Sequence, residues 1–180
     1  MPKNDNAHSI RLVDSLKRNV GDDTAKEFEG KYPLSRNANI EKKYEWAKDA
    51  CIYLEDQFDT ATIIQIRKDC RCNDGKSIAS KLLKYLNNTD SIEAFAEKFN
   101  QNETFASIEY ISDNNILFCY PKCYCACVKR IPQEVSKTWC YCTLGNAEGI
   151  FSSVFKKDVK VTLIESIKSG ANKCVIDVKW

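Results

Sequence analysis

Histidine is almost absent from this chain of 180 residues. The only one, His8, lies in the polar segment that opens the sequence. We expect that segment to be poorly ordered, because terminal residues without apolar anchors usually are. Catalysis that depends on a histidine base is therefore not expected.

Long apolar runs and an excess of one charge are also missing. No run approaches the roughly 18 apolar residues that a membrane span needs, and the first residues lack the apolar stretch of a signal peptide. Lys and Arg number 27 against 25 Asp and Glu, a net charge of +2, which argues against a nucleic-acid surface. We expect a cytoplasmic protein that binds neither membrane nor nucleic acid.

Linkers rich in Pro, Gly or Ser are absent, so we expect a single domain over 1–180. Residues 1–102 read as mainly helical. Apolar residues recur at steps of three and four after Asn39, which predicts a long helix. Asp59 is the expected N-cap of the next helix, and Asp90 with Glu93 resembles a capping box for a later one.

Residues 103–180 read as mainly strand, with one helix near 145–157. Alternating apolar residues predict strands at 105–111, 116–120, 123–129, 138–142, 159–163 and 174–180. The expected fold class is α+β, with N-terminal helices packed on one face of a C-terminal antiparallel sheet and one helix inserted before the last hairpin.

Cysteine is abundant, with ten residues, seven of them in the last third of the chain. Cys123, Cys125 and Cys127, and again Cys140 and Cys142, are spaced two apart, which on a strand would place their sulfurs on one face. In a reducing compartment they read as thiols, metal ligands or redox groups. Packing is the favoured role for most, because free cysteine behaves as a small buried hydrophobe.

Aromatic residues alternate with these cysteines and would occupy the opposite sheet face. They are Tyr120, Tyr124, Trp139 and Tyr141. Such a face either fills the core or forms the wall of a pocket for a flat, mainly apolar ligand.

The tail carries a family resemblance. Its motifs are Cys140-Tyr-Cys-Thr-Leu-Gly145, Gly149-Ile-Phe, Val159-Lys-Val-Thr-Leu-Ile-Glu165-Ser-Ile, Gly170 and Cys174-Val-Ile176. This pattern resembles the 4-vinyl reductase-like domains, which are small-molecule-binding α+β modules, and the related L-2-amino-thiazoline-4-carboxylate hydrolase-like proteins. The resemblance implies a binding domain for a small ring compound.

The resemblance also implies a zinc site with Cys142, Glu165 and Cys174 as ligands. Lys168 stands where a further cysteine is expected, so either Cys140 supplies the fourth ligand or no metal is bound. We favour no cofactor, because the lysine amine beside Glu165 would replace the charge of the metal.

Two functions from different classes remain open at this stage. The favoured one is a small-molecule-binding module. The alternative is a hydrolase of a small cyclic substrate, with Glu165 as acid or base and Cys142 as a nucleophile ahead of a helix. A redox or metal-storage protein is a third interpretation, and Trp180 could anchor the last strand or form the contact of a homodimer.

Overall fold

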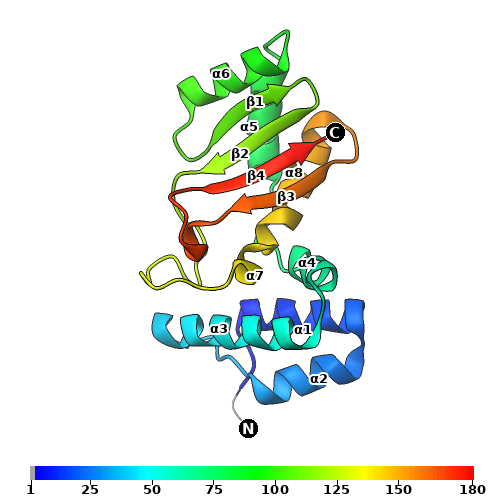
Figure 1. Ribbon diagram of the computed structural model, residues 1–180, viewed down its shortest axis with the longest axis vertical. Coiled ribbons are helices and arrows are strands. Elements are labelled where there is room, and N and C mark those ends of the chain that lie inside the picture. Colours follow the sequence, from blue (N-terminus) through cyan, green and yellow to red (C-terminus); the bar gives the residue numbers. More distant parts are fainter. Residues whose placement is uncertain (1–2) are drawn as a thin grey trace. The chain divides into compact units, whose positions relative to one another are not determined.

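The computed structural model describes residues 3–180. Its elements follow the chain in this order (Figure 1): α1 Ala7–Val20, α2 Asp22–Lys31, α3 Ile40–Gln57, α4 Thr60–Lys68, α5 Lys76–Leu86, α6 Ile92–Asn102, β1 Ser107–Ser112, β2 Asn115–Tyr120, α7 Lys137–Cys140, α8 Cys142–Phe155, β3 Lys160–Glu165, the short 3₁₀ helix η1 Ile167–Ser169, and β4 Cys174–Lys179. The α+β class is confirmed, as are the helices first, the antiparallel sheet last, and the helix before the last hairpin.

The chain forms two compact units. Unit 1 contains the residues up to Cys72 together with Tyr124–Gly145, and unit 2 contains Asn73–Cys123 together with Asn146–Trp180. Each unit is therefore built from two separate stretches of sequence. That the whole chain acts as a single domain stays a prediction.

Unit 1 is helical, and its helices begin where side chains cap them. Asn39 accepts a hydrogen bond from the amide of Lys42 at the start of α3, and Asp59 accepts one from Thr62 at the start of α4. Both starts were predicted. The apolar stripe of α3 is also confirmed, because the side chains at its steps of three and four are buried: Tyr44, Ala47, Cys51 and Leu54.

The predicted capping box at Asp90 is wrong by one residue. Ser91 is the N-cap of α6, and its hydroxyl accepts a hydrogen bond from the amide of Ala94 at 3.1 Å. A second helix near the N-terminus, α2, was not predicted, because only Ala25 and Phe28 of its ten residues are buried.

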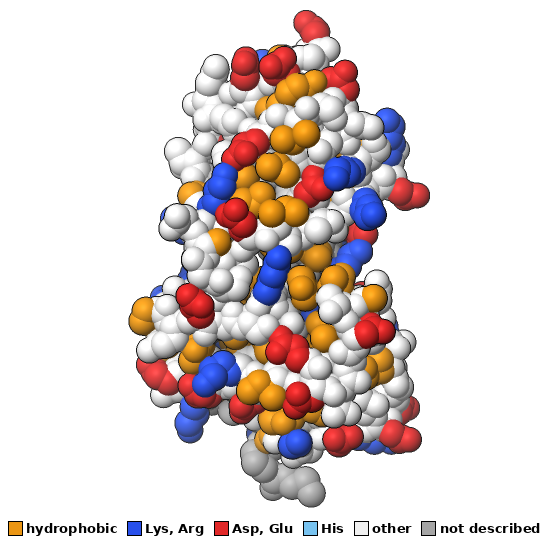
Figure 2. Space-filling model, viewed as in Figure 1, with side chains coloured by type: hydrophobic (Ala, Val, Ile, Leu, Met, Phe, Trp, Pro, Cys, Tyr) orange, Lys and Arg blue, Asp and Glu red, His pale blue; other side chains and the backbone are white. Residues whose placement is uncertain are grey.

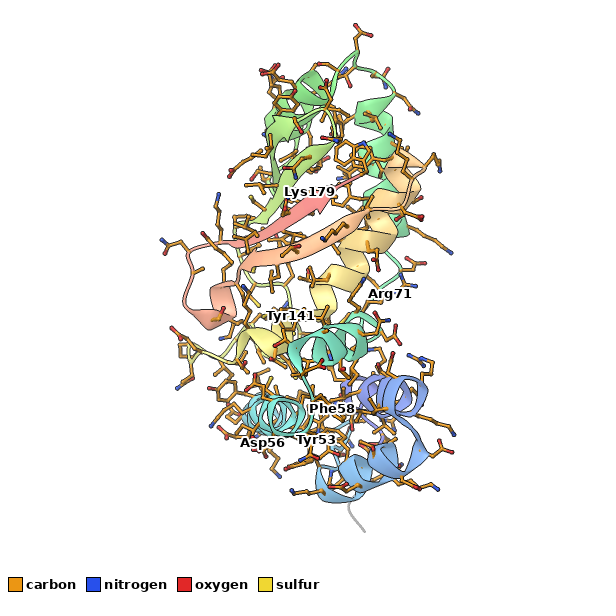
Figure 3. The ribbon with its side chains drawn as sticks, turned by 45° about the vertical axis from the view of Figure 1, so that its right-hand side comes forward. Tyr53, Asp56, Phe58, Arg71, Tyr141 and Lys179 are labelled. Atoms are coloured by element: carbon orange, nitrogen blue, oxygen red, sulfur yellow. The ribbon has the colours of Figure 1, made fainter. Side chains whose placement is uncertain are left out.

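Unit 2 contains the sheet, whose strands lie in the order β1-β2-β4-β3 with every neighbouring pair antiparallel. Figures 1 and 3 show α5 and α8 on one face of it. On that face Phe118 of β2 contacts Phe151 of α8 and Phe99 of α6, with ring centroids 5.1 and 6.2 Å apart. Figure 2 shows acidic, basic and apolar side chains mixed on the other face.

The strands predicted at 123–129 and 138–142 are wrong. Residues 126–130 form turns, with the amides of Val128 and Lys129 both bonded to the carbonyl of Cys125. Residues 137–140 form α7, which Ser136 caps at the amide of Thr138. Local hydrogen bonds therefore replace the cross-strand bonds that a sulfur-lined sheet face would need.

No helix within residues 3–180 is both long and apolar enough to cross a membrane.

Candidate functional site

A hollow of about 570 Å³ opens on the face of the unit 2 sheet away from α5 and α8. One row of in-register residues crosses that face through all four strands: Ser107, Cys119, Val175 and Glu165. Three of these four line the hollow, and Pro121 and the residues 170–173 after η1 form its rim. The sheet register therefore positions the floor and the last hairpin positions the rim.

Gly170 shapes the rim. It adopts φ +97° at the end of η1, a left-handed conformation that favours glycine. Its amide bonds to the carbonyl of Ile167, and the amide of Ala171 bonds to the carbonyl of Ser166. This tight turn brings Asn172 and Lys173 to the hollow.

The charged residues that line the hollow are Lys173 and Glu165, and Glu109 forms an ion pair with Lys173. The Lys173 ammonium lies 2.5 Å from Oε1 of Glu109, and the same oxygen lies 3.6 Å from the sulfur of Cys119. Lys173 lowers the pKa of Glu109, and Glu109 raises that of Lys173, with further contributions from Cys119 and Glu165. Burial, followed by Glu109, raises the pKa of Cys119 to about 11, so this thiol stays protonated.

The predicted residues Glu165 and Cys174 lie near the ends of β3 and β4 in unit 2. Glu165 lines the hollow and is exposed. The sulfur of Cys174 accepts a hydrogen bond from the amide of Ile167 at 3.4 Å, and Lys168 is buried. The other two predicted ligands, Cys140 and Cys142, belong to unit 1.

The predicted aromatic sheet face does not exist. Tyr120 lies on β2, Tyr124 is exposed in a loop, and Trp139 is buried in α7. Tyr141 joins α7 to α8 (Figure 3). These side chains were expected on one face because the three segments that carry them read as strands, and only the segment of Tyr120 is one.

In unit 1, Cys142 lies next to a close contact between helices α8 and α4. Gly145, in the first turn of α8, packs against the end of α4 so closely that a Cβ there would lie 2.0 Å from the carbonyl oxygen of Lys68. Cys142 is the first residue of α8, whereas the sequence placed it at the end of a strand, just ahead of a helix near 145–157. Burial raises the pKa of its thiol strongly, although the guanidinium of Arg67 opposes that effect, so the thiol is protonated rather than nucleophilic.

Arg67 is a charged residue that is buried in unit 1. It is 3% exposed on α4, donates a hydrogen bond of 2.6 Å to the carbonyl of Trp139, and its guanidinium carbon lies 4.3 Å from the centre of the Trp139 ring. Within residues 3–180 its Nε has no hydrogen-bond partner. Sequence reasoning missed this residue, because an arginine on an amphipathic helix usually faces solvent.

Cysteines from separate segments surround this guanidinium. Its charge acts on the thiols of Cys70, Cys142, Cys51 and Cys125. The indole nitrogen of Trp139 donates to the sulfur of Cys125 at 3.4 Å, and Arg11 lies 3.8 Å from the sulfur of Cys72. Burial raises the pKa of Cys51 and of Cys127 to about 12. No group of three or more Cys, His, Asp or Glu in the described part of the chain could hold a metal ion.

His8 also belongs to unit 1, which corrects the expectation of a poorly ordered segment. It lies in α1, with its ring centre 6.2 Å from that of Trp139. Arg11 approaches its Nδ1 at 3.3 Å, and because arginine only donates, Nδ1 must be unprotonated. Burial, then Arg11, Arg67 and Lys43, lowers the pKa of His8 to about 4.

Comparison with models of protein families shows to which family the chain belongs. A model described as a family of unknown function, DUF6144, matches residues 2–179. The chain belongs to the DUF6144 family. No curated protein matches it. The match covers both stretches of both units, so the hollow and the cysteine cluster lie within the DUF6144 region.

Solved structures similar to this DUF6144 chain include two H-NOX proteins. One is from S. oneidensis in the Fe(II)NO ligation state, with 11% identity, 97% of this chain and 98% of that chain covered, and a TM-score of 0.43. The other is an unliganded Fe(II) mutant from K. algicida, with 11% identity, 97% and 96% covered, and a TM-score of 0.45. Likeness at this level supports no argument about function.

Proposed function

We propose that this chain is a small-molecule-binding domain and that the hollow of unit 2 is its ligand site. One observation carries the proposal: the sheet register brings Ser107 and Glu165 to the same hollow as Asn172 and Lys173. Convergent polar groups around a concave surface are the usual basis of ligand recognition. The cysteine cluster of unit 1 is a poorer candidate for an organic ligand, because Arg67 and Trp139 at its centre are buried.

The lining determines the chemistry of the ligand. Glu165 accepts hydrogen bonds or pairs with a cation, whereas Asn172 and Ser107 both donate and accept. Lys173 offers a positive charge beside Glu109. A small ring compound with an amine or amide donor at one end and a carboxylate or carbonyl at the other fits these groups, and the resemblance to 4-vinyl reductase-like domains also implies a ring compound.

The hydrolase alternative has no observation in its favour. The thiol of its proposed nucleophile, Cys142, is protonated, because burial raises the pKa of this thiol. We therefore propose binding without turnover.

A thermal-shift screen of cyclic amides and aromatic amino acids tests the proposal. A bound compound should raise the melting temperature of the native chain, and Glu165→Gln should weaken its binding by about ten- to a hundredfold, the usual effect of losing a charge-assisted hydrogen bond. Glu97→Gln, an exposed change on α6 in the same unit, should leave binding unchanged. Binding that ignores Glu165→Gln would contradict the site, and turnover abolished by Glu165→Gln would restore the hydrolase.

A further inference from the structure

Two arginines of unit 1, Arg11 of α1 and Arg67 of α4, lie in the neighbourhood of the Trp139 ring. The guanidinium carbon of Arg67 is 4.3 Å from the centre of that ring, and the centre of the His8 ring is 6.2 Å from it. Nη2 of Arg11 is in turn 3.3 Å from Nδ1 of His8. These distances link both guanidiniums to one small region, which α1, α4 and α7 form although they lie far apart in the sequence.

Neither guanidinium has a carboxylate partner. Among the described residues, no Asp or Glu forms an ion pair with Arg11 or Arg67. The groups that they do contact are uncharged: Arg67 donates to the carbonyl of Trp139 at 2.6 Å, and Arg11 approaches the imidazole of His8 and, at 3.8 Å, the sulfur of Cys72. Other arginines of the unit differ, since Arg18 of α1 pairs with Asp69 at 3.3 Å.

Both arginines also keep a buried N–H group without a partner. Within the part of the chain that the structure describes, Nε of Arg11 and Nε of Arg67 are shielded from solvent and have no hydrogen-bond acceptor. A guanidinium cannot lose its proton, and a buried charge without a counter-ion is costly. Two of the nearby thiols, those of Cys70 and Cys142, do not supply the counter-ion, because burial raises their pKa values and keeps them protonated. The region therefore combines two positive charges with two donors that need an acceptor.

We propose that Arg67 and Arg11 bind one small planar oxyanion beside Trp139, of the shape that nitrate and a carboxylate group share. A guanidinium is planar, and its N–H groups match the oxygens of such an ion in spacing and direction. The ion supplies the acceptor that the Nε groups lack, and its negative charge offsets the charges of the two arginines. This site lies in unit 1 and uses none of the residues of the hollow in unit 2, so it is a second binding site.

The ion can reach the site along Arg11. Cys72, which Nη2 of Arg11 approaches at 3.8 Å, is exposed, and Arg11 itself is partly exposed. A side chain at the surface changes rotamer quickly, so Arg11 can turn aside without a change in the backbone. Arg67 is 3% exposed. Only an ion of few atoms can therefore reach its Nε while the surrounding helices stay folded, which excludes a ring compound as the ligand of this site.

Titration of the full-length chain with sodium nitrate, and separately with sodium acetate, at constant ionic strength tests the proposal. The melting temperature should rise along a saturating curve, and calorimetry should give one bound ion per chain. Arg67→Met and Arg11→Gln should each weaken binding by more than about tenfold, because each removes a charge-assisted hydrogen bond. Arg18→Gln is the matched control and should keep the native affinity, since Arg18 lies on the same helix as Arg11 but has Asp69 as its partner. A preference between the two salts distinguishes an inorganic ion from the carboxylate of an organic molecule.

Arg11→Gln is the decisive variant, because Arg11 is partly exposed and its change should leave the far-UV circular dichroism unaltered; it decides alone if Arg67→Met does not fold. Absence of saturable binding of either salt would overturn the proposal, since water alone would then satisfy the two Nε groups. Binding that survives Arg11→Gln, or that Arg18→Gln weakens as much, would overturn it too. None of these outcomes depends on a ligand in the hollow, so this test and that of the proposed function fail independently.

Discussion

At the scale of single residues, Gly145 allows α8 to begin against α4. Added side-chain volume at this position meets the backbone carbonyl of Lys68 rather than a flexible side chain. The two helices would have to separate, and Cys142 would move with its helix. The glycine thus links a local packing requirement to the position of a predicted site residue.

Gly145→Ala should destabilise the protein by about 1–3 kcal/mol, since the cost of overpacking exceeds the gain in helix propensity. Gly30→Ala is the matched control, because Gly30 lies in α2 with nothing within 4 Å of its added Cβ. That change should stabilise by up to about 1 kcal/mol. Urea unfolding midpoints measure the stability of both variants. If Gly145→Ala and Gly30→Ala changed stability in the same direction and by the same amount, the close contact at Gly145 would be contradicted.

His8 gives the protein a titration that can be followed without ambiguity, since it is the only histidine. The groups that face it are Arg11 of its own helix, Lys43 of α3, Arg67 of α4 and the Trp139 ring of α7. Burial of the imidazole is the main cause of its lowered pKa, and the three cations add to that effect. The folded state therefore holds the imidazole neutral where the unfolded chain would protonate it.

Stability should consequently fall as the pH drops from about 6.5 toward about 4, because in that window the unfolded state binds a proton that the folded state does not. Below a pH of about 4, His8 causes no further loss of stability. His8→Gln should make urea unfolding midpoints less dependent on pH within the window. An imidazole NMR signal that titrates near 6.5 in the folded protein would contradict the prediction.

Sequence reasoning could not find Arg67 or its surroundings. Arginine at one position of a short helix is read as a solvated residue, and only tertiary packing reveals that α3, α7 and the segment around Cys125 enclose it. The Cys-X-Cys spacing drew attention to thiols on which the charge of Arg67 acts, among them those of Cys70, Cys125 and Cys142. It suggested the wrong backbone for them, because cysteines two apart fit a turn as well as a strand.

At the scale of elements, one side chain ties α6 to the sheet. The amide of Asn100 donates to the carbonyl of Ile108 and accepts from its N–H, both at 2.8 Å. Ile108 lies on β1, which has a strand neighbour on one side only. Asn100 thus satisfies backbone groups of Ile108 on the open side of β1.

Asn100→Ala should destabilise the protein by about 1–2 kcal/mol, because two hydrogen bonds are lost and backbone groups of a largely buried strand residue are left unpaired. Asn102→Ala is the control, since the Asn102 side chain bonds to the carbonyl of Lys98 within its own helix. Its effect should be within about 0.5 kcal/mol of zero. Hydrogen exchange at the Ile108 amide should be faster in Asn100→Ala and unchanged in Asn102→Ala, which would show that the lost stability comes from this contact.

Elements with strong periodicity were predictable, and those decided by local hydrogen bonds were not. The stripe of α3 and the alternation in β2 and β4 indicate their structures directly. Helix α2 escaped prediction because it buries so little. Residues 123–129 and 138–142 were assigned to strands, although Ser136, shortly before the second of these stretches, is a typical helix cap. There, the alternation of cysteine and aromatic residues concealed the capping signal.

At the scale of the whole molecule, the order of the chain and the division into units do not coincide. Unit 1 needs Tyr124–Gly145 to complete it, although unit 2 supplies the 51 residues Asn73–Cys123 in between. The dependence has a physical basis. The Trp139 ring lies against Arg67 and 5.7 Å from the Trp46 ring, Tyr44 donates to the carbonyl of Glu134 at 2.7 Å, and the sulfur of Cys127 lies 3.4 Å from the carbonyl of Lys43.

Residues 1–72 alone should therefore lack cooperative unfolding, because Trp46 and Arg67 lose the partners that cover them. A single chain joining residues 1–72 to 124–145 through a flexible Gly/Ser linker should regain a cooperative thermal transition with helical circular dichroism. The same chain with Trp139→Ala should lose most of that gain, since truncating a buried tryptophan costs about 3–5 kcal/mol, comparable with the whole stability of a small unit. Cooperative melting of residues 1–72 by themselves would show that the second stretch is dispensable, and Arg67 would then need another explanation for its burial.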